Sequence, residues 1–270
     1  MKETREVPEI SQEVSTKRKR IAQWARENPE RSFSAIAHHI DLGWMREAWR
    51  RTRKDGALGV DRESAEEFSE NLDERLEDLL DRALSGRYKA PPVRRGYVPK
   101  GKGGKRPIGI PTLEDKVLQR AVVMLLEAIY EEDFEDFSYG FRPSRSQHAA
   151  LNALWEEIQK LGSCWVLDAD VRKYFDRIDH SQLRKILDRR VRDGVIRRLI
   201  DKWLKAGVWE EGKRWVPESG TPQGGVMTPR TQKITLALSW IRRGLERGRA
   251  KGKAVLDSNR FRAHLDFSYR

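Results

Sequence analysis

The sequence predicts an α+β protein that is rich in helix and contains a small antiparallel sheet. Three observations predict this class. Apolar residues recur at helical spacing through much of the first 160 positions. Two short strand-like segments, 93–99 and 106–111, flank a loop of lysine and glycine. A four-residue apolar run, Cys164 to Leu167, follows a helical segment and predicts a buried strand.

The N-terminal part of the chain is expected to be helical after a polar, unpatterned tail. We expect residues 1–15 to be mobile, because they carry no apolar period. Segments 16–28 and 41–53 then predict two short amphipathic helices with basic outer faces. Segment 63–84 carries one apolar stripe surrounded by acidic residues, which indicates a surface helix.

The middle of the chain predicts a hairpin followed by a core helix. Segments 93–99 and 106–111 are expected to pair around the flexible, basic loop 100–105. Thr112 to Asp115 resembles a capping box and opens a helix. Its inward residues are expected to be Val117, Leu118, Ala121, Val122, Leu125, Leu126 and Ile129. A second box, Ser144 to Gln147, opens a helix to about Lys160.

Composition points to a polyanionic partner. The 270 residues carry a net charge of +12, and the 38% of apolar residues exclude a disordered chain. Residues 94–120 hold eight basic and two acidic side chains, and residues 231–270 hold ten and three. Such concentrated charge favours phosphate binding through counterion release, although a merely soluble basic protein is the alternative.

Cysteine usage and hydropathy indicate a cytoplasmic protein without membrane contact. Cys164 is the only cysteine, which excludes a disulfide within the chain and leaves a cysteine-based zinc site unsupported. No apolar run approaches the roughly 20 residues that a membrane span needs. The first residues lack the apolar core of a signal peptide.

Asp170 is the strongest candidate for catalysis, because it ends a predicted buried strand. A carboxylate there, with the Val171 carbonyl beside it, can hold Mg²⁺. Asp168 shares its strand face, whereas Asp176 and Asp179 are expected to face solvent or cap the helix that starts at His180. Taken alone, Asp170 more often caps a turn or pairs with an arginine, and a two-metal site needs carboxylates from other segments.

Four other segments carry candidate binding residues. The glycines of segment 220–226 allow close backbone approach to a ligand around Gln223 and Gly224, or form an ordinary turn. The basic segment 100–106 suits a phosphate clamp, as would any basic surface hairpin. Segment 138–146 mixes aromatic residues and arginines, which suits either RNA contacts or a structural turn. The ring of Phe175 could pack against a sugar, or fill the core.

Six motifs in a fixed order resemble the bacterial group II intron-encoded reverse transcriptase and maturase proteins. The resemblance runs from about residue 16 to Pro229 and rests on segments 36–41, 54–61, 98–111, 139–143, 168–180 and 221–226. Their order is more specific than any single motif. The resemblance implies the fingers and partial palm of a right-hand polymerase that copies RNA into DNA and helps an intron RNA fold and splice.

The resemblance also implies roles for individual residues. Asp170 corresponds to the first metal-binding aspartate, assisted by the Val171 carbonyl, and Phe175 to the ring that excludes a ribonucleotide. The remaining implied contacts are Arg106 with Lys100 or Lys105 on the triphosphate, Gln223 and Gly224 beside the incoming nucleotide, and Tyr139, Phe141, Arg142 and Arg145 on RNA. The implied partners are group II intron RNA, an RNA template with a DNA primer, and deoxynucleotides; a homo-oligomer is left open.

The sequence departs from this family after Pro229. The tyrosine-x-Asp-Asp turn expected there is replaced by His264-Leu265-Asp266-Phe267, so the two-metal site is expected to be incomplete and polymerisation weak or absent. A non-catalytic intron-RNA-binding protein and an unstable remnant are the alternatives. The expected division is tail 1–15, N-terminal helical extension 16–62, fingers 63–160, partial palm 161–229 and divergent basic tail 230–270.

Overall fold

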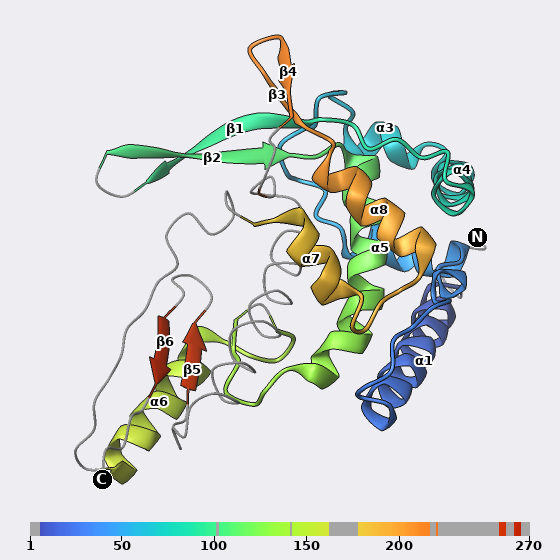
Figure 1. Cartoon of the computed structure of the whole chain (residues 1–270). Coiled ribbons are helices and arrows are strands. Elements are labelled where there is room, and N and C mark those ends of the chain that lie inside the picture. The colour runs from blue at the N-terminus through green and yellow to red at the C-terminus, as the bar shows by residue number, and fades with distance from the viewer. Residues whose placement is uncertain are drawn as a thin grey trace. The chain divides into compact units, whose positions relative to one another are not determined.

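The computed structural model describes residues 6–100, 103–140, 142–161, 178–216 and 220, together with strands 254–257 and 262–265. Figure 1 shows the chain with its elements labelled. It divides into two units, one formed by residues 1–132 and 175–228, the other by residues 133–174 and 229–270. We describe each unit by itself, beginning with the first.

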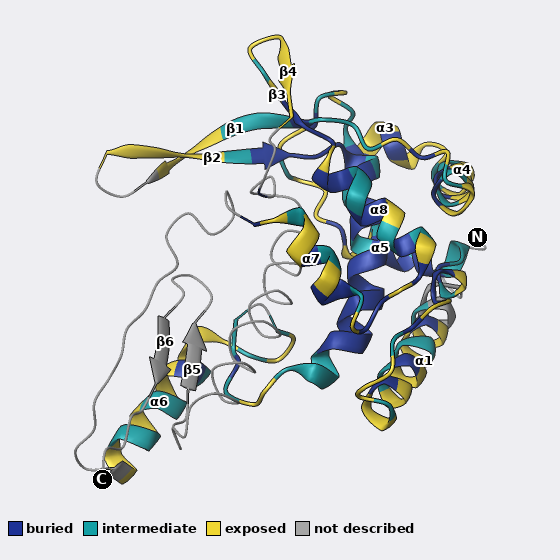
Figure 2. Ribbon diagram, in the orientation of Figure 1, coloured by how far each residue is buried: buried dark blue, intermediate teal, exposed yellow. Residues whose placement is uncertain are grey.

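Helix α5 (Leu113–Tyr130) is the centre of the first unit. Fifteen of its 18 residues are buried, including all seven that the sequence predicted to point inward. Figure 2 shows the helix as buried along nearly its whole length. A helix that is apolar around most of its surface must be covered on several sides. Helices α1 (Glu6–Glu27), α2 (Leu42–Arg51) and α4 (Leu72–Ser85) supply this cover.

Helix α1 begins ten residues earlier than the sequence predicted. We expected a helix from Thr16 after a mobile tail, but residues from Glu6 onward are already helical. Val14 is buried, as are Ile21 and Ala25. These three positions share one helical face, so the buried apolar stripe includes Val14, which precedes the predicted start at Thr16.

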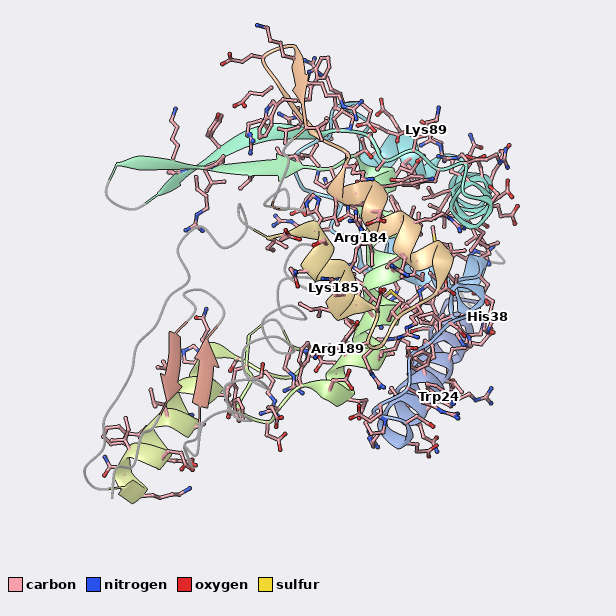
Figure 3. The ribbon with its side chains drawn as sticks, in the orientation of Figure 1. Trp24, His38, Lys89, Arg184, Lys185 and Arg189 are labelled. Carbon is pink, nitrogen blue, oxygen red and sulfur yellow. The ribbon has the colours of Figure 1, made fainter. Side chains whose placement is uncertain are left out.

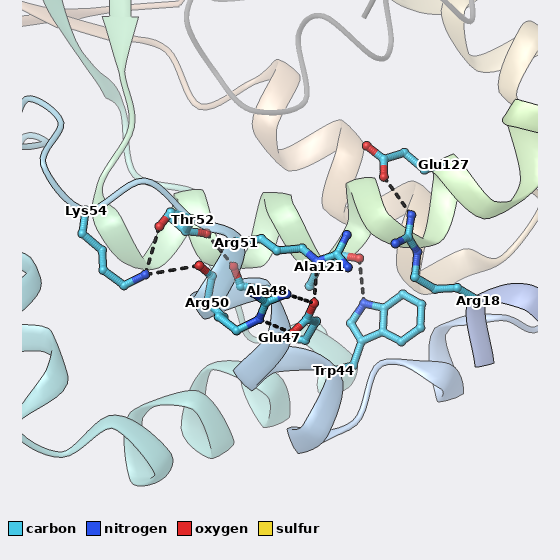
Figure 4. Close-up of polar contacts among 10 residues, drawn as sticks. All are labelled: Arg18, Trp44, Glu47, Ala48, Arg50, Arg51, Thr52, Lys54, Ala121 and Glu127. Atoms are coloured by element: carbon cyan, nitrogen blue, oxygen red, sulfur yellow. Dashed lines mark hydrogen bonds and ion pairs between the residues drawn. The ribbon is translucent and has the colours of Figure 1, made fainter. Parts of the chain in front are cut away.

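Polar contacts fix α2 and α1 against α5, as Figure 4 shows. The indole Nε1 of the buried Trp44 donates a hydrogen bond to the Ala121 carbonyl at 2.9 Å. Arg18 of α1 donates to the Glu127 carboxylate at 3.1 Å. Each contact gives a polar group in the helix interface a hydrogen-bond partner. The two contacts therefore fix how α1 and α2 are placed on α5, in addition to the apolar packing.

The single surface helix predicted for residues 63–84 is two helices. Helix α3 (Ala65–Ser69) begins with a capping box between Ser64 and Glu67, and α4 starts after Asn71. Asn71 has φ −128° and ψ 51°, which interrupts the helix. Asparagine tolerates such a position because its side chain competes with the helical backbone bonds.

The sheet of the first unit has the strand order β2-β1-β3-β4. Strands β1 (Val93–Lys100) and β2 (Gly104–Ile110) form the predicted antiparallel hairpin. Strands β3 (Val208–Glu210) and β4 (Lys213–Trp215) form a second hairpin that the sequence analysis missed. Strand β3 runs parallel to β1, so the sheet is antiparallel in two of its three pairings.

Two further helices complete the first unit. Helix α7 (His180–Leu187) is capped by Asp179, which accepts hydrogen bonds from the Ser181 and Gln182 N–H groups, as the sequence predicted. Helix α8 (Gly194–Leu204) is capped by Asp193. A 3-10 turn, η1 (Ala37–His39), precedes α2.

The second unit contains helix α6 (Gln147–Leu161) and a hairpin of β5 (Ala254–Asp257) and β6 (Arg262–Leu265). The 3-10 turn η2 (Glu131–Asp133) leads into it from α5. Helix α6 packs near β5. The helix-rich mixed class predicted from the sequence is confirmed. None of the helices in the described parts is long and apolar enough to cross a membrane.

Candidate nucleic-acid interface

The β1–β2 hairpin presents basic residues on both of its faces. Lys105 and Arg106 are exposed and lie opposite Pro99 and Val98 in the antiparallel register. Because neighbouring strand residues point to opposite faces, Lys105 and Arg106 cannot hold one ligand from the same side of the ribbon. Figure 1 shows the hairpin extending as a long ribbon beyond the helices of its unit.

The face that carries Lys105 is joined to the β3–β4 hairpin. Tyr97, on the same face by register, donates a hydrogen bond from its hydroxyl to Glu210. Arg95 pairs with Glu210 at 3.6 Å and lies over the Trp215 ring at 5.3 Å. The Tyr97 hydroxyl, hydrogen-bonded to this carboxylate, has a raised pKa. These contacts leave the opposite face, with Arg106, as the better candidate for the phosphate clamp.

Segment 54–61, one of the six family-like motifs, is a structural joint. A Cβ added at Gly59 would lie 2.5 Å from the Thr112 Cα and 2.8 Å from the Thr112 nitrogen. Only glycine allows this approach of two backbones. Lys116 donates to the Ala57 carbonyl at 2.9 Å, and Arg94 donates to the Leu58 carbonyl. The motif therefore holds the start of α5 against the start of β1.

The predicted RNA-binding turn of the second unit is held together by its own arginines. Arg142 donates to the Glu135 and Ser138 carbonyls at 2.8 and 3.1 Å, and its guanidinium lies over the Phe134 ring. Arg145 donates to the Asp136 carbonyl and lies over the Tyr139 ring at 5.2 Å. These contacts fit the structural alternative, because a guanidinium that closes a turn has less freedom to bind phosphate.

Segment 28–37 is fixed to the loop between α7 and α8. The Asp193 carboxylate accepts hydrogen bonds from the N–H groups of Ile36 and Ala37, as well as those of Val195 and Ile196. Desolvation alone would raise the pKa of Asp193, yet the four N–H donors hold it below the usual value. The charged carboxylate is therefore the form that the fold stabilises.

Arg190 closes the other end of the same segment. Its buried guanidinium donates to four carbonyl oxygens at 2.7 to 2.8 Å, those of Ala25, Asn28, Pro29 and Arg31. One of them, the Ala25 carbonyl, belongs to the last turn of α1, where carbonyl groups have no partner within the helix. Neither Arg190 nor Asp193 was a candidate in the sequence analysis, since Arg190 differs in no visible pattern from its neighbour Arg189.

A buried cluster around Asp115 ties α5 to α8. The Asp115 carboxylate accepts hydrogen bonds from the Tyr88 hydroxyl, from Trp203 Nε1 at 2.6 Å and from Gln119 Nε2 at 2.9 Å. Burial is the largest influence and raises the pKa of Asp115 to about 6, although the three donors oppose it. Asp115 was predicted only as part of a capping box, and Thr112 does accept its N–H.

The predicted catalytic residues lie outside the described parts of the chain. This applies to Asp170, Val171, Phe175, Gln223 and Gly224, and to Phe141 of the RNA-binding set. The described residues at the borders of these segments do meet. The Gly220 N–H donates to the Ile178 carbonyl at 2.9 Å, and the His180 ring is hydrogen-bonded to the Gly220 carbonyl at 2.7 Å.

The metal-binding prediction rests on the sequence. Across the parts of the chain that the structure describes, no three His, Cys, Asp or Glu side chains form a group suited to a metal ion. The predicted ligands Asp170 and Val171 fall in the undescribed segment before Ile178. Carboxylate and carbonyl oxygens remain the donors that Mg²⁺ prefers.

Residues 98–241 match the family described as reverse transcriptase (RNA-dependent DNA polymerase), which is more than half of the chain. The chain belongs to the reverse transcriptase family. The match extends twelve residues beyond Pro229, where the sequence analysis expected similarity to end. Reverse transcriptases of this family generally use a divalent metal.

Relatives of this chain include an intron-encoded protein. Protein YkfC of Escherichia coli (strain K12) is 36% identical over 230 residues, which are 83% of this chain and 60% of YkfC. Group II intron-encoded protein LtrA of Lactococcus lactis subsp. cremoris is 41% identical over 179 residues, which are 66% of this chain and 29% of LtrA. These similarities confirm the resemblance to group II intron-encoded reverse transcriptases and maturases.

The chain spans less than two thirds of the length of both relatives. Among solved structures, it is similar to a chain of the partial Cas6-RT-Cas1--Cas2 complex, with a TM-score of 0.45 and 20% identity. That similarity covers 84% of this chain and 37% of the solved chain.

Proposed function

We propose that the chain binds the RNA of a group II intron and descends from an enzyme that copies an RNA template into DNA from a primer. The observation that carries this proposal is the family match over residues 98–241, which includes residues 98–110 of the hairpin, the Asp170 segment and the glycine segment in order. Asp170 would bind Mg²⁺ together with the Val171 carbonyl, and Gln223 and Gly224 would lie beside the incoming deoxynucleotide. Phe175 would select against ribonucleotides.

The division into an N-terminal helical extension, fingers and partial palm belongs to this proposal. So do a cytoplasmic location and Arg106 as a triphosphate ligand, with Lys100 as its partner, because Lys105 is on the opposite face of the hairpin by register. For the RNA-binding set, the contacts of Arg142 and Arg145 within their own turn favour Tyr139 as the more available residue, since its ring is only partly covered.

We further propose that polymerisation by this chain is weak. Transition-state charge in nucleotidyl transfer is stabilised by two metals held by several carboxylates, and the segment where the catalytic turn is expected offers only Asp266. His264 and Leu265 of this segment are paired strand residues of β6, opposite Val255 and Ala254.

Primer extension on an RNA template with Mg²⁺ and deoxynucleotides tests this function. Wild type is expected to extend the primer barely above background, with any residual product lost in Asp170→Ala. Asp78→Ala, which removes a surface carboxylate of α4, is the matched control and should leave that residual product unchanged. Robust synthesis by wild type would contradict the weak-polymerase proposal and leave the polymerase assignment intact.

The competing function is a non-catalytic RNA-binding protein, which the concentrated basic charge of residues 94–120 favours. Its expected signature is salt-sensitive binding of structured intron RNA with equal affinity in wild type and Asp170→Ala. Equal affinity for heparin and for the RNA would instead indicate unspecific attraction between charges.

A further inference from the structure

A pocket of about 770 Å³ lies in the first unit, on elements outside the proposed polymerase site. Helix α1 forms one wall, residues 30–36 form a second, and the loop that follows α7 forms the third. Figure 3 labels Trp24 and Arg189, which contribute from the first and third of these segments. A pocket of this size accommodates a nucleotide, because ligand pockets for small molecules start at about 300 Å³.

The lining of this pocket is strongly basic. Four arginines, Arg20, Arg31, Arg189 and Arg192, reach it from three separate segments, and all four are exposed. Glu30 is the only acidic residue of the lining. Guanidinium groups donate paired N–H bonds in a geometry that matches phosphate oxygens, so the lining is suited to an anionic phosphate rather than to a cation or an apolar molecule.

An aromatic surface accompanies this charge. The Trp24 ring lies against the Phe33 ring, with centroids 4.3 Å apart and planes inclined by 56°. Both residues line the pocket, but Phe33 is only 8% exposed, whereas Trp24 is 36% exposed. An indole that is supported on one side and open on the other can stack on a nucleobase.

The walls of the pocket are fixed before any ligand binds. Arg190 and Asp193 hold segment 28–37 through five of the hydrogen bonds described above, three to its carbonyl groups and two from its N–H groups. Phe33 is also bridged to the α7–α8 loop by two backbone bonds of 2.7 Å, one to Arg190 and one from Arg192. Ligand binding should therefore cost little conformational entropy in the backbone around the pocket.

We propose that this pocket binds an unpaired nucleotide of an RNA strand, with the base stacked on Trp24 and the adjoining phosphates held by the four arginines. The combination of phosphate ligands and a stacking ring at one pocket is what single-stranded nucleic acid requires. The identity of the strand as RNA rests on the function proposed above.

Binding of an end-labelled, single-stranded RNA oligonucleotide to the full chain tests the proposal. Trp24→Ala is expected to weaken binding about tenfold, equivalent to about 1.4 kcal/mol, while Trp24→Phe retains most of the affinity. Trp155→Ala is the matched control, because Trp155 is 65% exposed on α6 and does not line the pocket. With an oligonucleotide that lacks bases, Trp24→Ala should cost nothing further.

The arginines are tested by charge removal. Arg31→Gln and Arg189→Gln should each reduce the slope of log affinity against log salt by about 0.7, as expected for the loss of one phosphate contact to a single strand. Arg198→Gln is the control, since Arg198 is exposed on α8 and lies outside the lining. Because the Arg31 side chain is exposed, this variant is expected to fold even if Trp24→Ala does not, and melting curves check both.

A photocrosslink gives an independent readout. Iodouridine in the oligonucleotide should crosslink to the peptide that contains Trp24. Binding that is as strong in Trp24→Ala and Arg31→Gln as in their controls would overturn the pocket proposal alone. Displacement of the RNA by adenosine monophosphate at equal affinity would instead assign the pocket to free nucleotides and overturn the RNA assignment. No RNA binding by wild type would overturn both this proposal and the proposed function.

Discussion

The Asp193 carboxylate accepts a hydrogen bond from the Ile36 backbone N–H at 2.7 Å, although the two residues are 157 positions apart in the chain. Asp193 is 5% exposed and accepts three further N–H bonds. Asp193→Ala leaves these buried donors without an acceptor, and we expect it to reduce the free energy of unfolding by about 3 kcal/mol. Urea unfolding measures this. Asp78→Ala is the control and should change the free energy by less than about 0.5 kcal/mol.

The same carboxylate predicts sensitivity to acid. Its pKa in the folded chain is lowered, so its stabilising contribution is present above the ordinary value of 3.8 and is lost as the pH falls through the folded pKa. Asp193→Asn should therefore lose less stability than wild type when the pH is lowered below about 4. Parallel unfolding curves for the two proteins across this range would contradict the assignment.

Asp115 predicts the opposite dependence on pH. Its pKa is raised from 3.8 to about 6, so the folded chain binds the proton more tightly than the unfolded chain does. Its contribution to stability is complete below about 4 and is lost as the pH rises to about 6, with a total of about 3 kcal/mol. Asp115→Asn should flatten this part of the stability profile. Denaturant unfolding at closely spaced pH values, with Glu114→Gln as the neighbouring control, measures the difference.

Gly59 is predicted to be intolerant of a methyl group. In Gly59→Ala the new Cβ would meet the Thr112 backbone at 2.5 Å, and we expect a loss of about 2 kcal/mol or more. Gly56→Ala is a matched control three residues away, because the nearest atom to its Cβ is Lys116 Nζ at 3.9 Å. Similar melting temperatures for the two variants would show that the backbones of Gly59 and Thr112 can move apart without loss of stability.

The two faces of the β1–β2 hairpin predict different effects for neighbouring residues. If Arg106 binds the triphosphate, Arg106→Ala should raise the KM for deoxynucleotides about tenfold, equivalent to about 1.4 kcal/mol. Lys105→Ala, on the face with Tyr97, should change it little. The comparison uses whatever residual primer extension the chain supports, or nucleotide binding measured directly by fluorescence. Equal effects would mean that the ribbon twists enough to bring both side chains to one ligand.

Local patterns predicted the local elements well. The hairpin of β1 and β2 followed from two strand-like segments around a glycine-rich loop, and α5 followed from its apolar period. Asp179 was recognised as a cap because its partners are two and three residues away. The β3–β4 hairpin was missed because its strands have only three residues each and its turn, Glu211-Gly212, carries a weak signal.

Contacts between distant segments could not be predicted from one sequence. Arg189 and Arg190 are adjacent and chemically identical, yet Arg189 is exposed and Arg190 is buried against the end of α1. The difference arises because the carbonyl groups of residues 25–31 lie where they accept hydrogen bonds from Arg190. Likewise, the alternation that puts Lys105 and Arg106 on opposite faces follows from the strand itself, but the sequence does not show which face carries the contacts of Tyr97 and Arg95 with Glu210 of β3.

The fastening of residues 28–37 by Arg190 and Asp193 has a consequence for synthesis on the ribosome. At about 5–20 residues per second, the 157 positions between Ile36 and Asp193 take roughly 8 to 30 seconds to translate. During that interval the N–H groups of Ile36 and Ala37 have only water or transient partners. The N-terminal segment is therefore synthesised early, but its hydrogen bonds to Arg190 and Asp193 form late. A nascent chain arrested before Arg190 would carry α1 without the hydrogen bond that Arg190 donates to its last turn.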